Sequence, residues 1–424
     1  MKSEWKECTI MDIDIDVIDG DRGKNYPHQN ELLNSGYCLF LSAKNVTQNG
    51  FLFGDNQFIT QEKDELLNNG KLKRGDIVIT TRGTVGNVAI YSDDVPYDNI
   101  RINSGMLIIR CSKEINNCYL YQVLRSKWFY NQIISIQSGS AQPQLPKSHF
   151  LKMTIPMPAL KTQNRIAAVL SALDDKIELN NKINENLEQQ AQAIFKSWFV
   201  DFEPFGGKMP DDWRQGTFSD IIESTLSGDW GKEKPTGNYT EQVYCIRGAD
   251  ITEVKVGNKG KMPTRYILPN NKMNKQLVAD NIVVEISGGS PTQSTGRVVA
   301  ISQSLLDRYD KAMICTNFCR AIKPIQKYSK FIYHYWQYLY DRKIFFSYEN
   351  GTTGIKNLDI SGFIETEPIT IPSVDVLDEF NELTSAFSSQ ISANGLENEK
   401  LSALRDTLLP KLMNGEIDVS EVKI

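Results

Sequence analysis

The chain is poor in the residues and motifs that mark metalloproteins and membrane proteins. It has 424 residues but only three histidines, none spaced from another as metal ligands would be. Its seven cysteines are odd in number and include no CxxC pair, which predicts reduced thiols and no structural zinc. No apolar run approaches the ~20 residues of a membrane span, and the first residues do not resemble a signal peptide. We therefore expect a cytoplasmic protein without a membrane anchor or metal site.

Catalytic motifs are missing as well. The sequence contains no GxGxxG, GxxxxGK[ST], HExxH or GxSxG pattern. It also lacks the Asn/Asp-Pro-Pro-Tyr tetrapeptide and the FxGxG signature of adenine methyltransferases. The acidic run Pro210-Asp211-Asp212 resembles part of a nuclease carboxylate cluster, but it falls between two blocks and has no counterpart earlier in the chain. We predict no catalytic residue in this chain.

The excess of negative over positive charge is small for the whole chain, but the balance varies along it. The net charge is −5, yet Lys and Arg outnumber Asp and Glu by 16 to 7 over residues 246–345. In residues 373–424 the balance is reversed, with 4 basic and 10 acidic residues. Nucleic-acid phosphates attract local basic surface, so the overall sign does not exclude DNA. Chance clustering of charge remains the alternative explanation.

What the chain does have is an internal repeat. Residues 4–13 recur with an offset of 208 in residues 212–221, and the matching positions are Trp5, Thr9, Asp12 and Ile13 with Trp213, Thr217, Asp220 and Ile221. A second match, offset by 214, joins residues 160–198 to 374–412. Each half is therefore a globular block followed by a long segment with a helical apolar period. Two similar halves predict a pseudo-twofold symmetric monomer, which suits a partner with two similar, separated surfaces such as duplex DNA.

Both long segments carry a sustained 4-3 spacing, which is typical of a coiled-coil seam. The first seam is Ile166, Leu170, Leu173, Ile177, Asn180, Asn184, Leu187, Ala191, Ile194 and Trp198. The second is Phe380, Thr384, Phe387, Ile391, Asn394, Asn398, Leu401, Arg405, Leu408 and Leu412. A helix of about 40 residues is ~60 Å long. We expect the two helices to pack antiparallel.

Two asparagines occupy matching seam positions in each helix: Asn180 and Asn184 in the first, and Asn394 and Asn398 in the second. A buried Asn costs stability but fixes helix register, because it pairs well only with another polar group. We expect these residues to set the register of the helix pair. The alternative is that they are solvated where the seam opens.

Each globular block is expected to mix short strands with at least one helix. Helical patterns at 116–134 and 328–346 carry aromatic stripes that are more typical of core than of base stacking. Polar loops follow these helices, at 138–144 and 350–357, and glycine loops occur at 82–87 and 287–296. Asn and Gln can bind adenine edges, and Arg and Lys can bind guanine. The candidate DNA-binding residues are Arg82, Gly83, Gln142, Gln144, Arg297, Thr352, Thr353 and Lys356. Between the two copies these loops match less well than the strands beside them, which suits one scaffold that binds two different targets. Ordinary sequence drift in loops would produce the same pattern.

The helical motifs resemble those of the specificity subunit of type I restriction-modification enzymes. The resemblance covers the whole chain in order and is carried by residues 155–158, 163–167, 173–177, 183–188, 195–204 and 404–417. It implies an α+β fold: target-recognition domains at 1–158 and 204–372, and conserved helices at 159–203 and 373–424 that form an antiparallel coiled coil. Thr384 and Arg405 depart from an apolar seam.

The resemblance also implies a function and partners. It implies a non-catalytic subunit whose two domains each bind one half of a split, asymmetric DNA site, with the helices setting the gap. Two modification subunits would dock on the helices and methylate adenine with S-adenosylmethionine. Two restriction subunits would add ATP- and Mg²⁺-dependent translocation and cleavage, so this subunit needs no cofactor of its own. The other hypotheses are a coiled-coil protein scaffold without DNA specificity and a stand-alone restriction-methylation enzyme.

Overall fold

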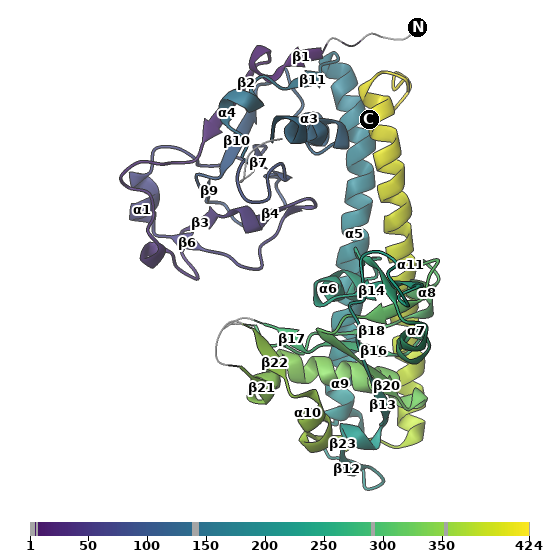
Figure 1. Ribbon diagram of the computed structural model, residues 1–424. Coiled ribbons are helices and arrows are strands. Elements are labelled where there is room, and N and C mark those ends of the chain that lie inside the picture. The colour runs from purple at the N-terminus through teal and green to yellow at the C-terminus, as the bar shows by residue number, and fades with distance from the viewer. Residues whose placement is uncertain (1–4, 6, 138–143, 290–292, 352–354, 424) are drawn as a thin grey trace. The chain divides into compact units, whose positions relative to one another are not determined.

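The computed structural model describes residues 5, 7–137, 144–289, 293–351 and 355–423. The chain forms two compact units (Figure 1). Unit 1 comprises Met1–Asp175 and Ser402–Ile424, and unit 2 comprises Lys176–Leu401. The sequence suggested boundaries at the ends of the long helices. The boundary between the two units falls within each long helix, because each globular block buries its core against the nearest helical turns.

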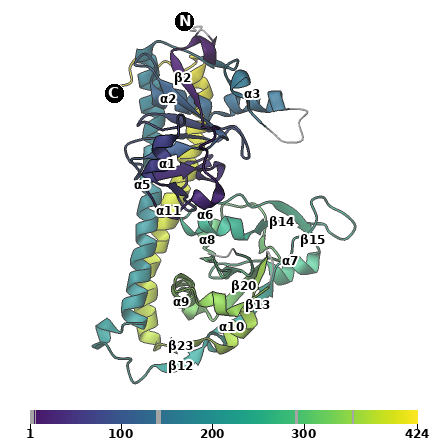
Figure 2. The same cartoon turned by 90° about the vertical axis from the view of Figure 1, so that its left-hand side faces the viewer.

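The two long helices are α5 (Leu160–Phe199) and α11 (Val374–Met413), of 40 residues each. All of the predicted seam positions are buried or half-buried. Within unit 1, Ile166 and Leu170 share a core with Leu409 and Leu412, and within unit 2 the rings of Phe195 and Phe380 lie 6.2 Å apart. Later residues of α5 contact earlier residues of α11, so the helical segments of each unit pack antiparallel. Both views draw them side by side (Figures 1 and 2).

The departures from an apolar seam are accommodated by local partners. Arg405 donates through Nη1 to Asp174 Oδ1 at 2.7 Å, and Asp174 also accepts from Arg125 Nη1 at 3.0 Å. The hydroxyl of Thr384 donates to the backbone oxygen of Phe380 at 2.7 Å, one helical turn earlier. Each polar seam residue therefore has a hydrogen-bond partner, which removes most of the cost of its burial.

Unit 1 is built on an antiparallel sheet in the order β2 (Ile15–Asp19), β10 (Met106–Cys111), β7 (Ile77–Thr80) and β8 (Val88–Ile90). Side chains alternate between the faces of a strand. Accordingly, Ile77 and Ile79 join the core formed with the helices, whereas Val78 joins the core beneath a second, smaller sheet. That sheet has the order β6 (Phe58–Ile59), β3 (Cys38–Leu41), β9 (Ile100–Ile102), with β3 and β9 parallel.

Unit 2 repeats this topology strand by strand. Its four-stranded sheet has the order β13 (Ile222–Ser227), β20 (Cys319–Pro324), β16 (Ile282–Glu285) and β18 (Val298–Ala300). Its smaller sheet has the order β15 (Thr264–Ile267), β14 (Glu241–Ile246), β19 (Met313–Cys315), with β14 and β19 parallel. The internal repeat of the sequence is therefore a repeat of the fold.

The segment that enters each block pairs with the segment that leaves it. β1 (Glu7–Thr9) is antiparallel to β11 (Thr154–Pro156), and β12 (Arg214–Thr217) is antiparallel to β23 (Pro368–Ile371). Proline cannot donate to a strand ladder, so it favours such edge positions and the helix entry that follows. The repeated Trp-Thr-Asp-Ile pattern marks these entry strands.

Two predicted helices have different bounds in the structure. The pattern at 116–134 forms two helices, α2 (Asn117–Leu124) and α3 (Lys127–Gln137), because the hydroxyl of Ser126 accepts from the backbone N–H of Phe129 at 3.1 Å and starts a new helix. The pattern at 328–346 forms α9 (Ser329–Asp341), which ends before Lys343 at φ +62°. The aromatic stripe of α9 is mostly buried in the core of unit 2, as predicted.

The remaining elements are short. They are β4 (Val46–Thr47), β5 (Gly50–Phe51), α1 (Gln61–Leu66), α4 (Lys147–Phe150), α6 (Ile251–Lys255), α7 (Pro269–Lys275), β17 (Ser287–Gly288), α8 (Gln303–Leu306), β21 (Glu349–Asn350), β22 (Lys356–Leu358) and α10 (Ile360–Thr366), together with several 3-10 turns. No helix in the described ranges is both long and apolar enough to cross a membrane.

A buried histidine joins α9 to α5 and makes the stability of unit 2 depend on pH. Burial lowers the pKa of His334 to about 4, and Glu188, Lys255 and Lys330 are the charged groups around it. In the unfolded chain the His334 side chain has a pKa near 6.5, whereas in the folded chain its pKa is about 4, so acid favours the unfolded chain. Stability should therefore fall by about 3 kcal/mol in all as the pH drops from 6.5 to 4.

Urea denaturation at pH 7.5 and pH 5 measures this loss. The variant His334→Gln should lose most of the pH dependence, whereas the exposed His28→Gln should keep it. Equal pH dependence in wild type and His334→Gln would show that other groups cause it.

Candidate nucleic-acid interface

Four turns of unit 1 meet at one end of its main sheet. They are Gly20–Gly23, which follows β2; Thr81–Gly83, which follows β7; Asn103–Gly105, which precedes β10; and Gln144–Leu145. The backbone oxygen of Gly105 accepts from the N–H groups of Thr81 at 2.7 Å and Arg82 at 3.2 Å. Leu145 N donates to Thr81 O at 3.0 Å, and Arg82 pairs with Gln144 as an isolated bridge. We call these segments the four-turn cluster of unit 1.

Unit 2 contains the same cluster, made of Gly228–Gly231, Ile286–Gly288, Thr316–Phe318 and Asn357–Leu358. The backbone oxygen of Phe318 accepts from Ile286 N at 2.9 Å and Ser287 N at 3.2 Å. Leu358 N donates to Ile286 O at 2.8 Å, and Ser287 pairs with Asn357. The hydrogen bonds match those of unit 1 one for one. They place Ser287 where unit 1 has Arg82, Asn357 where it has Gln144, and Phe318 where it has Gly105.

The structure places the predicted DNA-binding residues of unit 1 within this cluster, as far as it describes them. Arg82, Gly83 and Gln144 are exposed there, and Arg82 and Gln144 face each other across the bridge. Gln142, Thr352 and Thr353 lie outside the described residues. Guanidinium and carboxamide groups of this kind can hydrogen-bond to base edges in a groove of duplex DNA.

Two predicted residues of unit 2 have partners within the protein. Arg297 donates from Nε and Nη2 to Glu285 at 2.7 and 2.6 Å, and the Glu285 carboxylate raises the pKa of Arg297 although burial opposes this. Lys356 Nζ donates to Glu349 Oε2 at 2.7 Å, and the other oxygen of Glu349 accepts from Thr295 N at 2.6 Å. A guanidinium or ammonium held in this way contributes to the loop framework. The geometry favours a structural role for Arg297 and Lys356 over direct base contact.

A repeated turn within both clusters was missed from the sequence. Gly20-Asp21-Arg22-Gly23-Lys24 and Gly228-Asp229-Trp230-Gly231-Lys232 share four of five residues at an offset of 208, the offset of the entry strands. The aspartate accepts from the second glycine N–H in each, at 2.7 Å for Asp21 and 2.9 Å for Asp229. We call this segment the Gly-Asp-X-Gly turn. Extending the first repeat by a few residues would have found it.

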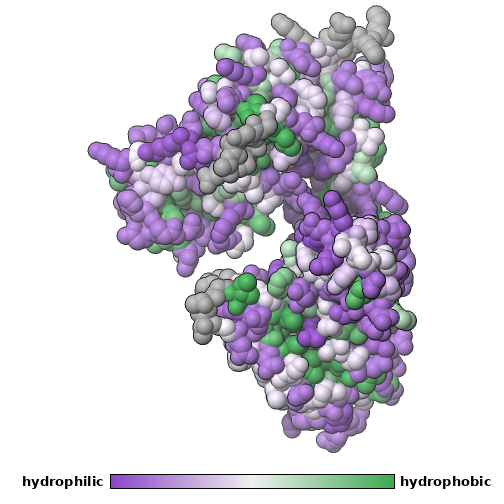
Figure 3. Space-filling model, in the orientation of Figure 1, coloured by the Kyte–Doolittle hydropathy of each residue, from purple (hydrophilic) through white to green (hydrophobic). Residues whose placement is uncertain are grey.

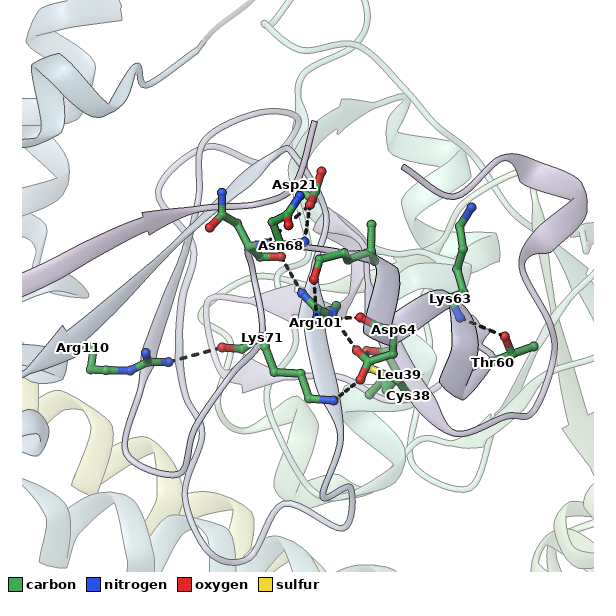
Figure 4. Close-up of polar contacts among 12 residues, drawn as sticks. Asp21, Cys38, Leu39, Thr60, Lys63, Asp64, Asn68, Lys71, Arg101 and Arg110 are labelled. Carbon is green, nitrogen blue, oxygen red and sulfur yellow. Dashed lines mark hydrogen bonds and ion pairs between the residues drawn. The ribbon is translucent and has the colours of Figure 1, made fainter. Parts of the chain in front are cut away.

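A buried ion-pair network holds this turn in unit 1 (Figure 4). Arg101 donates through Nε to Asp64 Oδ1 at 2.5 Å and through Nη1 to Asn69 O at 2.7 Å, and Lys71 also pairs with Asp64. Asp21 accepts from Asn68 N at 2.8 Å. Burial raises the pKa of Asp64, but bonds from Lys71 and Arg101 outweigh it, so the pKa lies below its usual value. The network thus connects α1, β9 and the Gly-Asp-X-Gly turn.

The four seam asparagines are buried and come together within unit 2. Asn180 Nδ2 donates to Asn398 Oδ1 at 2.9 Å. Asn394 Nδ2 donates to Asn184 Oδ1 at 2.7 Å. Asn184 also donates to Val256 O at 2.9 Å, so this layer contacts the globular part of the unit.

The surface around these features is mostly polar. On the face drawn in Figure 3, hydrophilic residues dominate both units and hydrophobic ones form small patches. Among the described residues, no group of His, Cys, Asp or Glu is arranged to hold a metal ion. The arrangement is suited to binding through hydrogen bonds and charge.

Comparison with known proteins agrees with this picture. Residues 2–189 match the family model of the type I restriction modification DNA specificity domain. The type I restriction enzyme MjaIX specificity subunit of Methanocaldococcus jannaschii is 28% identical over 82% of this chain and 79% of its own length. The HindI specificity subunit of Haemophilus influenzae is 25% identical over 98% of this chain and 100% of its own. A type I specificity subunit structure from M. genitalium has a TM-score of 0.49 at 16% identity, covering 96% of each chain.

The matched region thus identifies a DNA specificity domain of the restriction-modification class, and a second unit of the same topology follows it. Over most of its length the chain is similar to specificity subunits of type I restriction-modification enzymes, which supports a role in DNA sequence specificity.

Proposed function

We propose that each unit binds one half of a bipartite, asymmetric site on duplex DNA through its four-turn cluster. The observation that carries this proposal is that one backbone cluster occurs twice with different exposed side chains. Contacts to phosphates position a protein on DNA, whereas side chains at base edges determine sequence. A shared frame with different side chains suits two half-sites of different sequence.

In this proposal α5 and α11 set the gap between the half-sites. The buried asparagine pairs Asn180–Asn398 and Asn184–Asn394 fix the register, because a shift of one heptad would leave most of their amides opposite apolar residues. The outer faces around Lys176–Lys182 and Glu397–Arg405 would dock the modification subunits.

Specificity subunits are a non-catalytic class that assembles with other restriction-modification subunits and binds DNA. For this chain we propose a cytoplasmic complex with two modification subunits, which methylate adenine N6 with S-adenosylmethionine. Two restriction subunits would add cleavage that depends on ATP and Mg²⁺. These cofactors would belong to the partner subunits, and this chain would direct their activity to its site.

Exchange of one recognition domain tests the two-half model. Residues 1–158 are replaced by the matching block of another specificity subunit, and the chimera is co-expressed with a modification subunit. Sequencing of methylated adenines should show one new half-site and one unchanged half-site, at the same gap. A change in both half-sites would contradict the model.

A binding measurement provides the control. Affinity of the wild-type complex for duplex DNA should fall steeply with salt, because binding that neutralises phosphates releases counterions. A complex whose affinity for duplex DNA does not depend on sequence or salt would instead favour a protein scaffold.

A further inference from the structure

The Gly-Asp-X-Gly turn has the same backbone frame in both units. A Cβ atom on Gly20 would lie 2.2 Å from Asn103 O, and one on Gly228 would lie 1.8 Å from Thr316 O. Only glycine fits at so close an approach. Because the first glycine and the aspartate fix the turn against the neighbouring turn, residue X is presented from the same place in each unit.

The fixed aspartates are anchored outside the turn as well. Asp21 is buried and accepts from Asn68 N at 2.8 Å, and Asp229 Oδ2 accepts from Asn271 Nδ2 at 2.6 Å. In unit 2, Lys275 Nζ also donates to Gly228 O at 2.9 Å. Each anchor joins the turn to the helical region that precedes β7 or β16. The frame is therefore rigid in both units, although different residues provide the anchors.

Residue X differs in chemistry and is exposed in both units. The Arg22 side chain is 56% exposed and makes only long contacts, from Nη2 to Asp19 Oδ1 at 3.2 Å and to Ser104 O at 3.3 Å. Trp230 is 37% exposed, and the Arg265 guanidinium lies 3.8 Å from its ring centre. Core packing therefore does not account for either side chain, so Arg22 and the exposed part of Trp230 are available to a ligand.

The neighbouring turns extend this contrast. In unit 1, Arg22 reaches Ser104, and the next residue, Gly105, accepts from Arg82 N. Unit 1 thus presents two guanidinium groups, from Arg22 and Arg82, in one cluster. In unit 2, the Gly105 position is Phe318, which is 53% exposed, and the Arg82 position is Ser287. Unit 2 thus presents two aromatic side chains, Trp230 and Phe318.

We propose that residue X is a specificity-determining residue in each unit, an inference that rests on the proposed DNA-binding function. A guanidinium donates two hydrogen bonds to guanine O6 and N7 in the major groove, so Arg22 selects guanine in the half-site bound by unit 1. An aromatic side chain makes apolar contact with the thymine C5 methyl group. Trp230, with Phe318 beside the same turn, selects thymine in the half-site bound by unit 2.

The test uses the complete chain in complex with a modification subunit and a pool of DNA duplexes with randomised inserts. Sequences selected by wild type, Arg22→Ala and Trp230→Ala are compared. In Arg22→Ala, discrimination for guanine at one position should fall about ten- to hundredfold, while the other half-site is unchanged. In Trp230→Ala, discrimination for thymine should fall in the opposite half only. Each variant is thereby the control for the other.

Two further variants separate base recognition from phosphate binding and from folding. Lys24→Ala removes an exposed charge two residues from Arg22 and should weaken all sequences evenly without changing the selected site. Arg22→Lys should restore affinity but not the full guanine preference, because lysine lacks the planar fork of donors. Thermal unfolding should be unchanged in Arg22→Ala, Arg22→Lys and Lys24→Ala, whereas Trp230→Ala, which loses the stack on Arg265, should unfold at a slightly lower temperature but remain folded.

The outcomes are distinguishable. If wild type selects a bipartite site and Arg22→Ala and Trp230→Ala select the same site, the inference is wrong and the proposed function stands. An even loss of affinity for every sequence in Arg22→Ala would likewise assign Arg22 to phosphate and overturn the inference. If wild type itself selects no sequence, the proposed function fails and the inference fails with it.

Discussion

Replacing Arg101 by methionine is expected to lower the free energy of unfolding of unit 1 by about 3 kcal/mol, because it removes one of the two cationic partners of a buried carboxylate and the donor to neighbouring backbone oxygens. The side chains of Arg101 and Asp64 are each only 7% exposed. The guanidinium also donates to Asp64 O and Leu67 O, at 2.8 and 3.0 Å. Methionine fills similar space but provides no donor, so Leu67 O would lose this bond and Asp64 O would keep only the 3.3 Å bond from Leu67 N.

Chemical denaturation of Arg101→Met and of a surface control measures this effect. Lys44 pairs with Asp55 at 3.3 Å, but these side chains are 79% and 75% exposed. Lys44→Met should therefore cost about 0–1 kcal/mol. The network would not have the assigned role if the two variants were equally stable. Because the network also anchors the Gly-Asp-X-Gly turn, Arg101→Met should weaken sequence selection in one half-site only.

The second large effect is expected from Gly395→Ala in α11. A Cβ atom there would lie 1.8 Å from Gly257 O, which itself accepts from Arg308 Nη1 at 2.8 Å. The substitution should gain about 1 kcal/mol of helix propensity. It must, however, push away the loop that Asn184 holds through Val256 O. Overpacking and the lost hydrogen bonds together cost about 3 kcal/mol, so a net destabilisation of unit 2 by about 2 kcal/mol is expected.

A nearby exposed position of the same helix provides the matched control. Ala393 is exposed, and Ala393→Ser should cost about 0.5 kcal/mol through helix propensity alone. Thermal unfolding of both variants separates the effects. A Gly395→Ala protein as stable as wild type would show that the loop moves freely and does not fix the globular part of unit 2 on its helices.

Much of the fold could be predicted because it depends on periodic burial. The 4-3 apolar spacing indicated α5 and α11, and every predicted seam position is buried or half-buried. The aromatic stripe of α9 was correctly assigned to the core. The break between α2 and α3 was not predicted, because a single hydroxyl, that of Ser126, decides it within an otherwise continuous apolar pattern.

The candidate site was harder to predict because it depends on contacts between distant segments. Their place in a glycine-rich loop and a polar loop suggested Arg297 and Lys356 as DNA-binding residues, but the sequence could not show that Glu285 and Glu349 would pair with them. A glycine that packs against another backbone belongs to no periodic sequence pattern. Gly20 or Gly228 taken alone therefore could not be identified as part of a site. Only their repetition at the offset of 208 residues was visible in the sequence.

The two units also differ in how their cores are assembled from the chain. The core of unit 1 contains Leu409, Leu412, Met413 and Val419 beside strands from the first 111 residues, whereas unit 2 is one continuous stretch, Lys176–Leu401. During vectorial synthesis on a ribosome, unit 2 can therefore bury its core before unit 1 has received its last helical turns. The first block to emerge would be the last to be completed. Until then its apolar helix-facing surface is exposed, which makes it the part of the nascent chain most dependent on chaperones.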